Sequence, residues 1–148
     1  MVISGDSQWK RRLTPEAVAA LYTNSELYLK DYREGIWRSK INLSFLTHSN
    51  QDEFVHKSFE IAACQGFLLA ERSPGHTARF VEDEEAVFFT GFDECVEKIR
   101  KYLPDEAARE RIATAGRARA VRDGYGNDAQ VGAIVERVRS IFHARSAI

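Results

Sequence analysis

The chain has 148 residues, of which 44% are hydrophobic and 29% are charged. This length is typical of one domain with a buried core. The formal net charge of −1 argues against a general nucleic-acid partner, and no apolar run is long enough to cross a membrane. We therefore expect a cytoplasmic globular protein.

The cysteines and histidines do not form a metal-binding pattern. Cys64 and Cys95 lie on predicted apolar helix faces, which favours buried thiols over a disulfide, and the four histidines are scattered. The sequence also lacks a glycine-rich phosphate loop. We expect neither a metal nor a cofactor.

Short predicted strands and helices alternate in the first third of the chain. The end of a strand is predicted at 2–5, a helix start at 14–15 and a short strand at 27–29. A helix from Asp31 and a strand at 41–45 follow. Because the chain begins almost inside a strand, we expect it to be a fragment of a longer protein.

A helix, a glycine turn and a buried strand are predicted in the middle of the chain. Val55, Phe59 and Ala62 share one helix face by their spacing. Gly66 is predicted to end this helix in the left-handed conformation. The apolar run 67–70 is typical of a strand that is covered on both faces, so the unit indicates a parallel sheet.

One more strand and a helical end are predicted for the rest of the chain. An exposed acidic run at 82–85 precedes a strand at 86–89. Three amphipathic helices follow; the second has an arginine-rich face that we expect to be solvated, and the last begins with Asn127 as its cap. The last helix carries a stripe that we expect to be buried, made of Val131, Val135, Val138 and Phe142.

Together these elements predict a single α/β domain over residues 1–148. The domain is expected to be Rossmann-like, with three αβα layers, a mostly parallel sheet and a helical C-terminal end. In open sheets of this kind, ligands bind beyond the carboxyl ends of the strands.

Polar residues follow two of the predicted strands. Ser49, Asn50 and Asp52 lie after strand 41–45 and lead into a helix N-terminus, where an anion such as phosphate is favoured. Each of the three could instead be an ordinary N-cap residue of that helix.

The second polar loop follows strand 67–70 and contains Arg72 and His76. Carboxylates such as Glu60 could bind sugar hydroxyls, while Lys57 or Arg72 could meet phosphate. Lys57 and Glu60 are also spaced as an ordinary helix-surface pair. A polar ligand site is therefore expected at this edge, with the ligand left open.

Residues 57–73, KSFEIAACQGFLLAERS, resemble the signature of CgeB-like glycosyltransferases, a bacterial group related to the retaining GT-B enzymes of family four. The resemblance continues through 80–89, 94–103 and 111–117, and upstream through 32–45. It covers most of the chain, and the order of the blocks is the same.

The resemblance implies the C-terminal lobe of a GT-B enzyme, which holds a nucleotide-diphosphate sugar as donor. Related enzymes have two glutamates separated by seven residues. Glu60 matches the second, which holds the ribose hydroxyls, and Asp52 stands in place of the first, which faces the donor sugar. Lys57 stands where relatives often have arginine, Gln65 where they have glycine, and Gly75 where they often have an acid.

Two residues are thus candidates for catalysis, Asp52 and Glu60. The candidates for donor binding are Ser49, Asn50, Lys57, Glu60, Arg72 and His76.

The implied reaction is transfer of a hexose, with retention, to an unknown acceptor. The N-terminal lobe that binds the acceptor has no counterpart in the chain, so we expect weak donor binding and no useful turnover without it. Two alternatives stay open: a lobe of a nucleotide-sugar epimerase, and a non-catalytic interaction domain on the same fold.

Overall fold

The structure is a computed structural model that describes residues 1–5, 7–23 and 26–146. The chain divides into two compact units, Met1–Arg38 and Ser39–Ile148. Each unit is described by itself below.

The first unit contains three short helices, α1 (Trp9–Arg12), α2 (Pro15–Leu21) and α3 (Leu29–Arg38). The predicted start of α2 is confirmed, because the Thr14 hydroxyl accepts a hydrogen bond from the Ala17 amide at 3.3 Å. The prediction of a strand at 27–29 is wrong, since residue 29 already begins α3.

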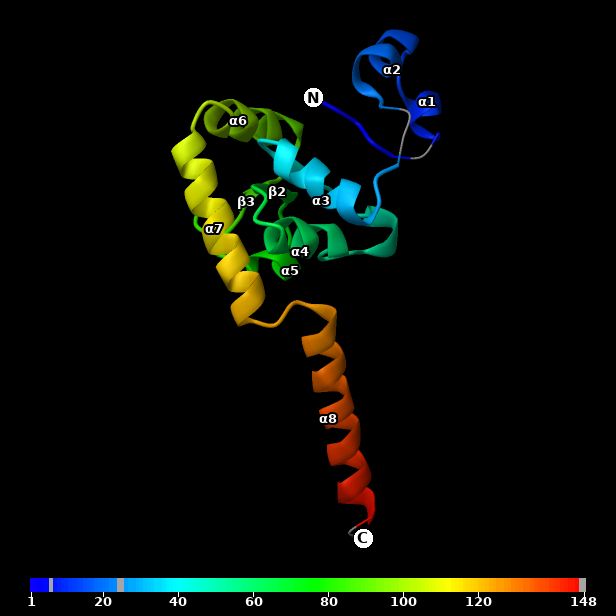
Figure 1. Ribbon diagram of the computed structural model, residues 1–148, viewed down its shortest axis with the longest axis vertical. Helices are drawn as coiled ribbons and strands as arrows, with labels where there is room; N and C mark the ends of the chain where they lie inside the picture. Colours follow the sequence, from blue (N-terminus) through cyan, green and yellow to red (C-terminus); the bar gives the residue numbers. More distant parts are fainter. Residues whose placement is uncertain (6, 24–25, 147–148) are drawn as a thin grey trace. The chain divides into compact units, whose positions relative to one another are not determined.

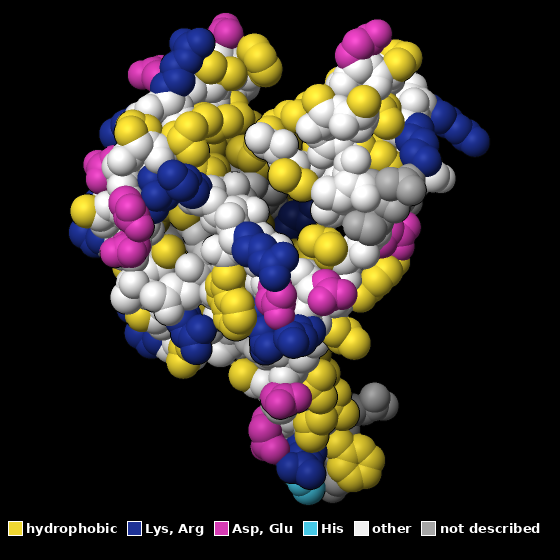
Figure 2. Space-filling view, turned by 45° about the horizontal axis from the view of Figure 1, so that its top comes forward, with side chains coloured by type: hydrophobic (Ala, Val, Ile, Leu, Met, Phe, Trp, Pro, Cys, Tyr) yellow, Lys and Arg dark blue, Asp and Glu magenta, His cyan; other side chains and the backbone are white. Residues whose placement is uncertain are grey.

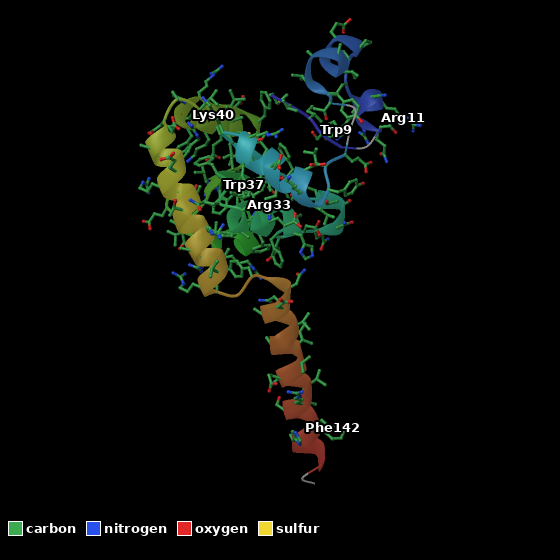
Figure 3. All side chains as sticks on the ribbon, viewed as in Figure 1. Trp9, Arg11, Arg33, Trp37, Lys40 and Phe142 are labelled. Carbon is green, nitrogen blue, oxygen red and sulfur yellow. The ribbon has the colours of Figure 1, made fainter. Side chains whose placement is uncertain are left out.

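Two further features of the first unit concern its ends. Ile3 forms a single parallel bridge with Tyr22, where the end of a strand was predicted. On α3, Arg33 and Trp37 lie one turn apart (Figure 3), with the guanidinium carbon 5.0 Å from the ring centre.

The second unit is built on three parallel strands, β1 (Asn42–Ser44), β2 (Leu68–Glu71) and β3 (Val87–Phe89), in the order β1-β2-β3. β1 and β3 lie within runs that the sequence predicts as strands, and β2 is shifted by one residue from the predicted strand 67–70. β2 is the central strand, and its first three residues are buried, as its uninterrupted apolar sequence predicts.

Helices cover both faces of this sheet, so the predicted α/β fold with three layers is confirmed. Leu69 and Val87 pack on one face in a core that includes Cys95 of α6 (Phe92–Tyr102). The opposite face carries α4 (His56–Ala63) and α5 (Pro74–Thr77), and Figure 1 shows the strands between α4 and α6.

The helical C-terminal end consists of α7 (Glu106–Arg122) and α8 (Asn127–Ser146). α7 crosses the edge of the sheet where the strands begin. The Gln65 amide donates to the Thr114 hydroxyl at 3.1 Å, and Arg119 pairs with Glu85 at 3.3 Å, just before β3.

Arg111, Arg117 and Arg122 of α7 are exposed as predicted, whereas Arg109, Arg119 and part of the acidic run are less exposed than predicted. Arg109 is only 7% exposed, and its guanidinium donates to the carbonyls of Tyr102 and Leu103 at 2.7 and 2.6 Å, which satisfies the end of α6. Glu82 and Glu85 are partly buried in ion pairs with arginines. These charged side chains are partly buried because they bind partners that are distant in the sequence, which the local sequence pattern does not reveal.

The end of α4 differs from the prediction in one residue. Gln65, not Gly66, takes the left-handed conformation, with φ of 60°. The Gly66 amide bonds the Ile61 carbonyl at 2.8 Å and the Gln65 amide bonds the Ala62 carbonyl at 2.9 Å, which together make a Schellman motif. The buried face of α4 is also shifted, to Ser58, Ile61 and Ala62.

The prediction of a buried stripe on α8 is wrong. Val131, Val138 and Phe142 are 57%, 59% and 68% exposed, and Val135 is also exposed. Figure 2 shows hydrophobic side chains along one side of α8, at the bottom of the view, and Phe142 is labelled near its end in Figure 3. Asn127 was predicted to be the N-cap residue that precedes this helix. In the structure Asn127 is already its first residue, and residue 126 precedes it.

A short 3-10 helix, η1 (His48–Asn50), lies between β1 and α4. No helix in the described part of the chain has the length and apolar character needed to cross a membrane.

Candidate functional site

A groove runs along the outer face of α4, between this helix and the segment that joins α7 to α8. The helix contributes residues at helical spacing, with Glu60 one turn after His56. Asp52 lines the same groove from the loop before α4. Both carboxylates that the sequence singles out therefore lie in one depression of the surface.

Aromatic rings form the apolar part of the groove. Phe59 lies edge-to-face against Tyr125 and Phe54, with ring centres 5.0 and 5.6 Å apart. The Arg79 guanidinium lies over the Phe54 ring, 3.9 Å from its centre. The groove thus combines an apolar lining with three carboxylates, Asp52, Glu60 and Asp128, and with Arg79, which suits a ligand with both ring and charged groups.

A left-handed glycine places Tyr125 in this groove. Gly124 has φ of 64°, and the following Tyr125 amide bonds the Ala120 carbonyl at 3.0 Å, which ends α7. The Tyr125 hydroxyl donates to the Arg79 carbonyl at 3.0 Å. The sequence predicts the helix break at residues 124 and 126, but not the role of the tyrosine between them.

Of the six predicted donor-binding residues, Glu60 lines the groove and the other five do not. Lys57 is exposed on α4, and Ser49 and Asn50 are exposed in η1. The alternative prediction that Ser49, Asn50 or Asp52 caps α4 is wrong, because Val55 precedes the helix and no side chain caps it.

Arg72 is held by the protein itself at the carboxyl end of β2. Its guanidinium pairs with Glu82 and with Glu94, the latter at 3.2 Å, and donates to the Thr90 hydroxyl at 3.1 Å. The hydrogen bond to Glu82 raises the pKa of Arg72. This arginine joins β2 to the segments around β3, so a phosphate would have to compete with two carboxylates.

His76 is fully buried, so it does not touch a ligand in the groove. Its Nδ1 lies 2.8 Å from the Glu71 carbonyl, its Nε2 lies 2.8 Å from the Ser58 hydroxyl, and its ring stacks on Phe88. Burial lowers the pKa of His76. The histidine is thus a neutral core residue that supports the site.

Sequence reasoning missed Phe54, Arg79 and Tyr125 as residues of the groove. Phe54 and Arg79 carry no distinguishing local pattern, since they meet only in the folded chain. Among the residues that the structure describes, no group of three histidine, cysteine, aspartate or glutamate side chains is placed to hold a metal ion. Both cysteines are free thiols.

The fold matches that of part of a GT-B glycosyltransferase, and the chain belongs to the glycosyl transferase-like family, whose model matches residues 1–136. The chain is similar in structure to the sucrose-phosphate synthase of Thermosynechococcus elongatus, with a TM-score of 0.72 and 18% sequence identity. The likeness covers 97% of this chain and 38% of that synthase, so the chain spans well under half of its length. No curated protein matches the chain. The narrower resemblance to CgeB-like enzymes stays a prediction.

Proposed function

We propose that the chain is the donor-binding lobe of a glycosyltransferase, which takes a sugar from a nucleotide-diphosphate sugar and passes it to an acceptor on a second lobe. Membership of the glycosyl transferase-like family supports sugar transfer. The observation that carries the proposal is that Asp52 and Glu60, with seven residues between them, line one groove.

In this proposal the two carboxylates have different partners. The ionised Glu60 accepts hydrogen bonds from the ribose hydroxyls, which are stronger than bonds between neutral groups. Asp52 faces the donor sugar, with a reach one methylene shorter than that of glutamate. Retention at the sugar and a reaction without a metal ion are part of the proposal, and both come from the resemblance to the family.

Arg79 takes the phosphate-binding role that the sequence suggests for Arg72 or Lys57. It lines the groove together with Asp52 and Glu60. One of its terminal nitrogens donates to the Gly75 carbonyl at 2.9 Å, and the planar guanidinium has further donors for a phosphate oxygen.

Titration of the labelled chain with UDP, GDP, UDP-glucose and GDP-mannose, followed by NMR, tests the proposal. We expect the backbone amide resonances of residues around Glu60 to shift with at least one nucleotide. Glu60→Gln is expected to weaken that binding about tenfold, because a neutral amide replaces a charged acceptor.

Glu110→Gln is the matched control, since Glu110 is an exposed glutamate on α7 outside the groove. It is expected to bind as the unchanged chain does. A folded chain whose resonances near Glu60 respond to none of the four compounds would contradict the proposed function.

A further inference from the structure

The loop after β2 touches both segments that carry the groove's carboxylates. This loop consists of residues 73–76 and includes the first turn of α5. The sequence singles it out as a ligand-binding loop, yet its histidine is buried. Its contacts indicate another role in the same site.

The first contact fixes the loop that contains Asp52. The Ser73 hydroxyl donates to the main-chain carbonyl of Glu53 and accepts a hydrogen bond from the His76 amide at 3.0 Å. Gly75 packs against the same residue: a Cβ atom at Gly75 would lie 2.7 Å from the Glu53 carbonyl oxygen. The neighbour of Asp52 is thus held by a hydrogen bond and by close packing.

The second contact fixes α4, which carries Glu60. A carbonyl can only accept, so the His76 Nδ1 holds the ring proton and donates to Glu71. The Nε2 of the neutral ring is then an acceptor, and the Ser58 hydroxyl donates to it. The Ser44 hydroxyl of β1, 2.9 Å away, is left to donate to Ser58. This chain of hydrogen bonds has one direction, and the side chains of Ser44, Ser58 and His76 that form it are buried.

We propose that residues 73–76 form a positioning turn, which sets the distance between Asp52 and Glu60 by holding Glu53 on one side and Ser58 on the other. The proposal rests on the proposed donor site. None of the turn's residues lines the groove, so the turn acts through its neighbours and not by touching the donor.

Two variants that each touch one side of the turn test this. Gly75→Ala presses a methyl group against the Glu53 main chain, and Ser58→Ala removes the hydroxyl from α4. If the turn is one unit, Gly75→Ala shifts the amide resonances of residues 57–60, and Ser58→Ala shifts those of residues 52–54. Variants that shift only their own side would overturn the proposal, whether or not a nucleotide binds. Ser73→Ala replaces Gly75→Ala if that variant does not fold.

Affinity for UDP-glucose and GDP-mannose gives the second measurement. We expect Gly75→Ala and Ser58→Ala each to weaken binding about tenfold or more, because a small misplacement of contacting groups is costly. The control is Gly116→Ala, which strains the opposite edge of the sheet at Glu85 and should keep the affinity within about twofold.

The outcomes separate the two proposals. Affinity that falls in all three variants in step with their melting temperatures would overturn the positioning role. A chain that binds neither nucleotide would overturn the proposed function, and the amide shifts across the turn would then decide the positioning role alone.

Discussion

His76 makes the stability of the domain depend on pH near neutrality. Burial lowers its pKa below the usual value of about 6.5, with the charge of Arg79 adding to this effect and Glu71 opposing it. Between the folded and unfolded pKa values, the unfolded chain therefore binds more protons than the folded one. The contribution of His76 to the free energy of unfolding is therefore fully present above about pH 6.5, and it is lost as the pH drops below that value.

Denaturant unfolding at pH values from about 7.5 to 5.5 measures this effect, in a range above the titration of ordinary carboxylates. His76→Gln is expected to lower stability at pH 7.5 by about 1–3 kcal/mol, because the Ser58 hydroxyl loses its partner, and to flatten the pH dependence. His143→Gln, at an exposed position of α8, is the control. An unchanged slope in His76→Gln would contradict the assignment.

Substitutions of Arg72 and Arg79 are expected to have different effects on stability and on ligand binding. Arg72 joins β2 to Glu82 and Glu94, so Arg72→Gln is expected to lower stability by about 1 kcal/mol and leave nucleotide affinity nearly unchanged. Arg79→Gln is expected to weaken nucleotide binding more than it lowers stability, since Arg79 lines the groove. Thermal melts and the nucleotide titration, run on both variants, measure the two effects. The opposite pattern would indicate that Arg72, and not Arg79, binds the phosphate.

The helix α7 crosses the edge of the sheet where the strands begin, and its close packing there requires a glycine. Gly116 lies in the middle of this helix, where alanine would ordinarily be more stable by up to about 1 kcal/mol. A Cβ atom there would lie only 2.4 Å from the Glu85 carbonyl oxygen. Gly116→Ala is therefore expected to reverse the usual sign and to destabilise the domain by about 1–3 kcal/mol in denaturant unfolding.

Gly132→Ala on α8 is the matched control for α7, because a Cβ atom at Gly132 would meet nothing within 4 Å. Here the intrinsic preference for alanine should prevail, and circular dichroism should show equal or greater helix content. A stabilised Gly116→Ala would mean that α7 and the segment before β3 can move apart.

The elements that the sequence predicts well are those whose signal is local. The strands at 41–45, 67–70 and 86–89 were found because apolar runs between turn residues are strand signals, and the start of α2 was found from Thr14 and Pro15. The choice of Gln65 over Gly66 for the left-handed position was not predictable from propensity, since a distant partner, Thr114, holds the Gln65 side chain.

The site was predictable only in part for the same reason. Asp52 and Glu60 lie close together in the sequence, so their spacing can be read directly from it. Arg79 and Tyr125, which complete the groove, come from later parts of the chain. His76 has the composition of a ligand-binding residue, and only the packing of α4 and α5 on the same face of the sheet reveals it as buried. Residue types indicate what a side chain can do, but burial decides which of these roles is available.

For the whole molecule, the main feature is α8, a helix with an exposed apolar face. The face consists of exposed residues at helical spacing, Val131, Ile134, Val135, Val138, Ile141 and Phe142. Helices of soluble proteins normally bury such a face against another element. The chain spans 38% of the synthase with the similar fold, and the proposed transferase needs a second lobe to hold the acceptor.

The exposure of α8 predicts a large difference in local stability between the last two helices. The described side chains of α8, residues 127–144, are all exposed, and a helix with so little burial is only marginally stable in water, whereas α7 buries Ile112 and Ala113. Hydrogen exchange measured by mass spectrometry should therefore show rapid exchange along α8 and strong protection in the middle of α7. Protection of α8 equal to that of α7 at low protein concentration would contradict this prediction, because it would require a packing partner within the chain. Protection that appears only as the concentration rises would instead show that exposed apolar faces of separate copies associate.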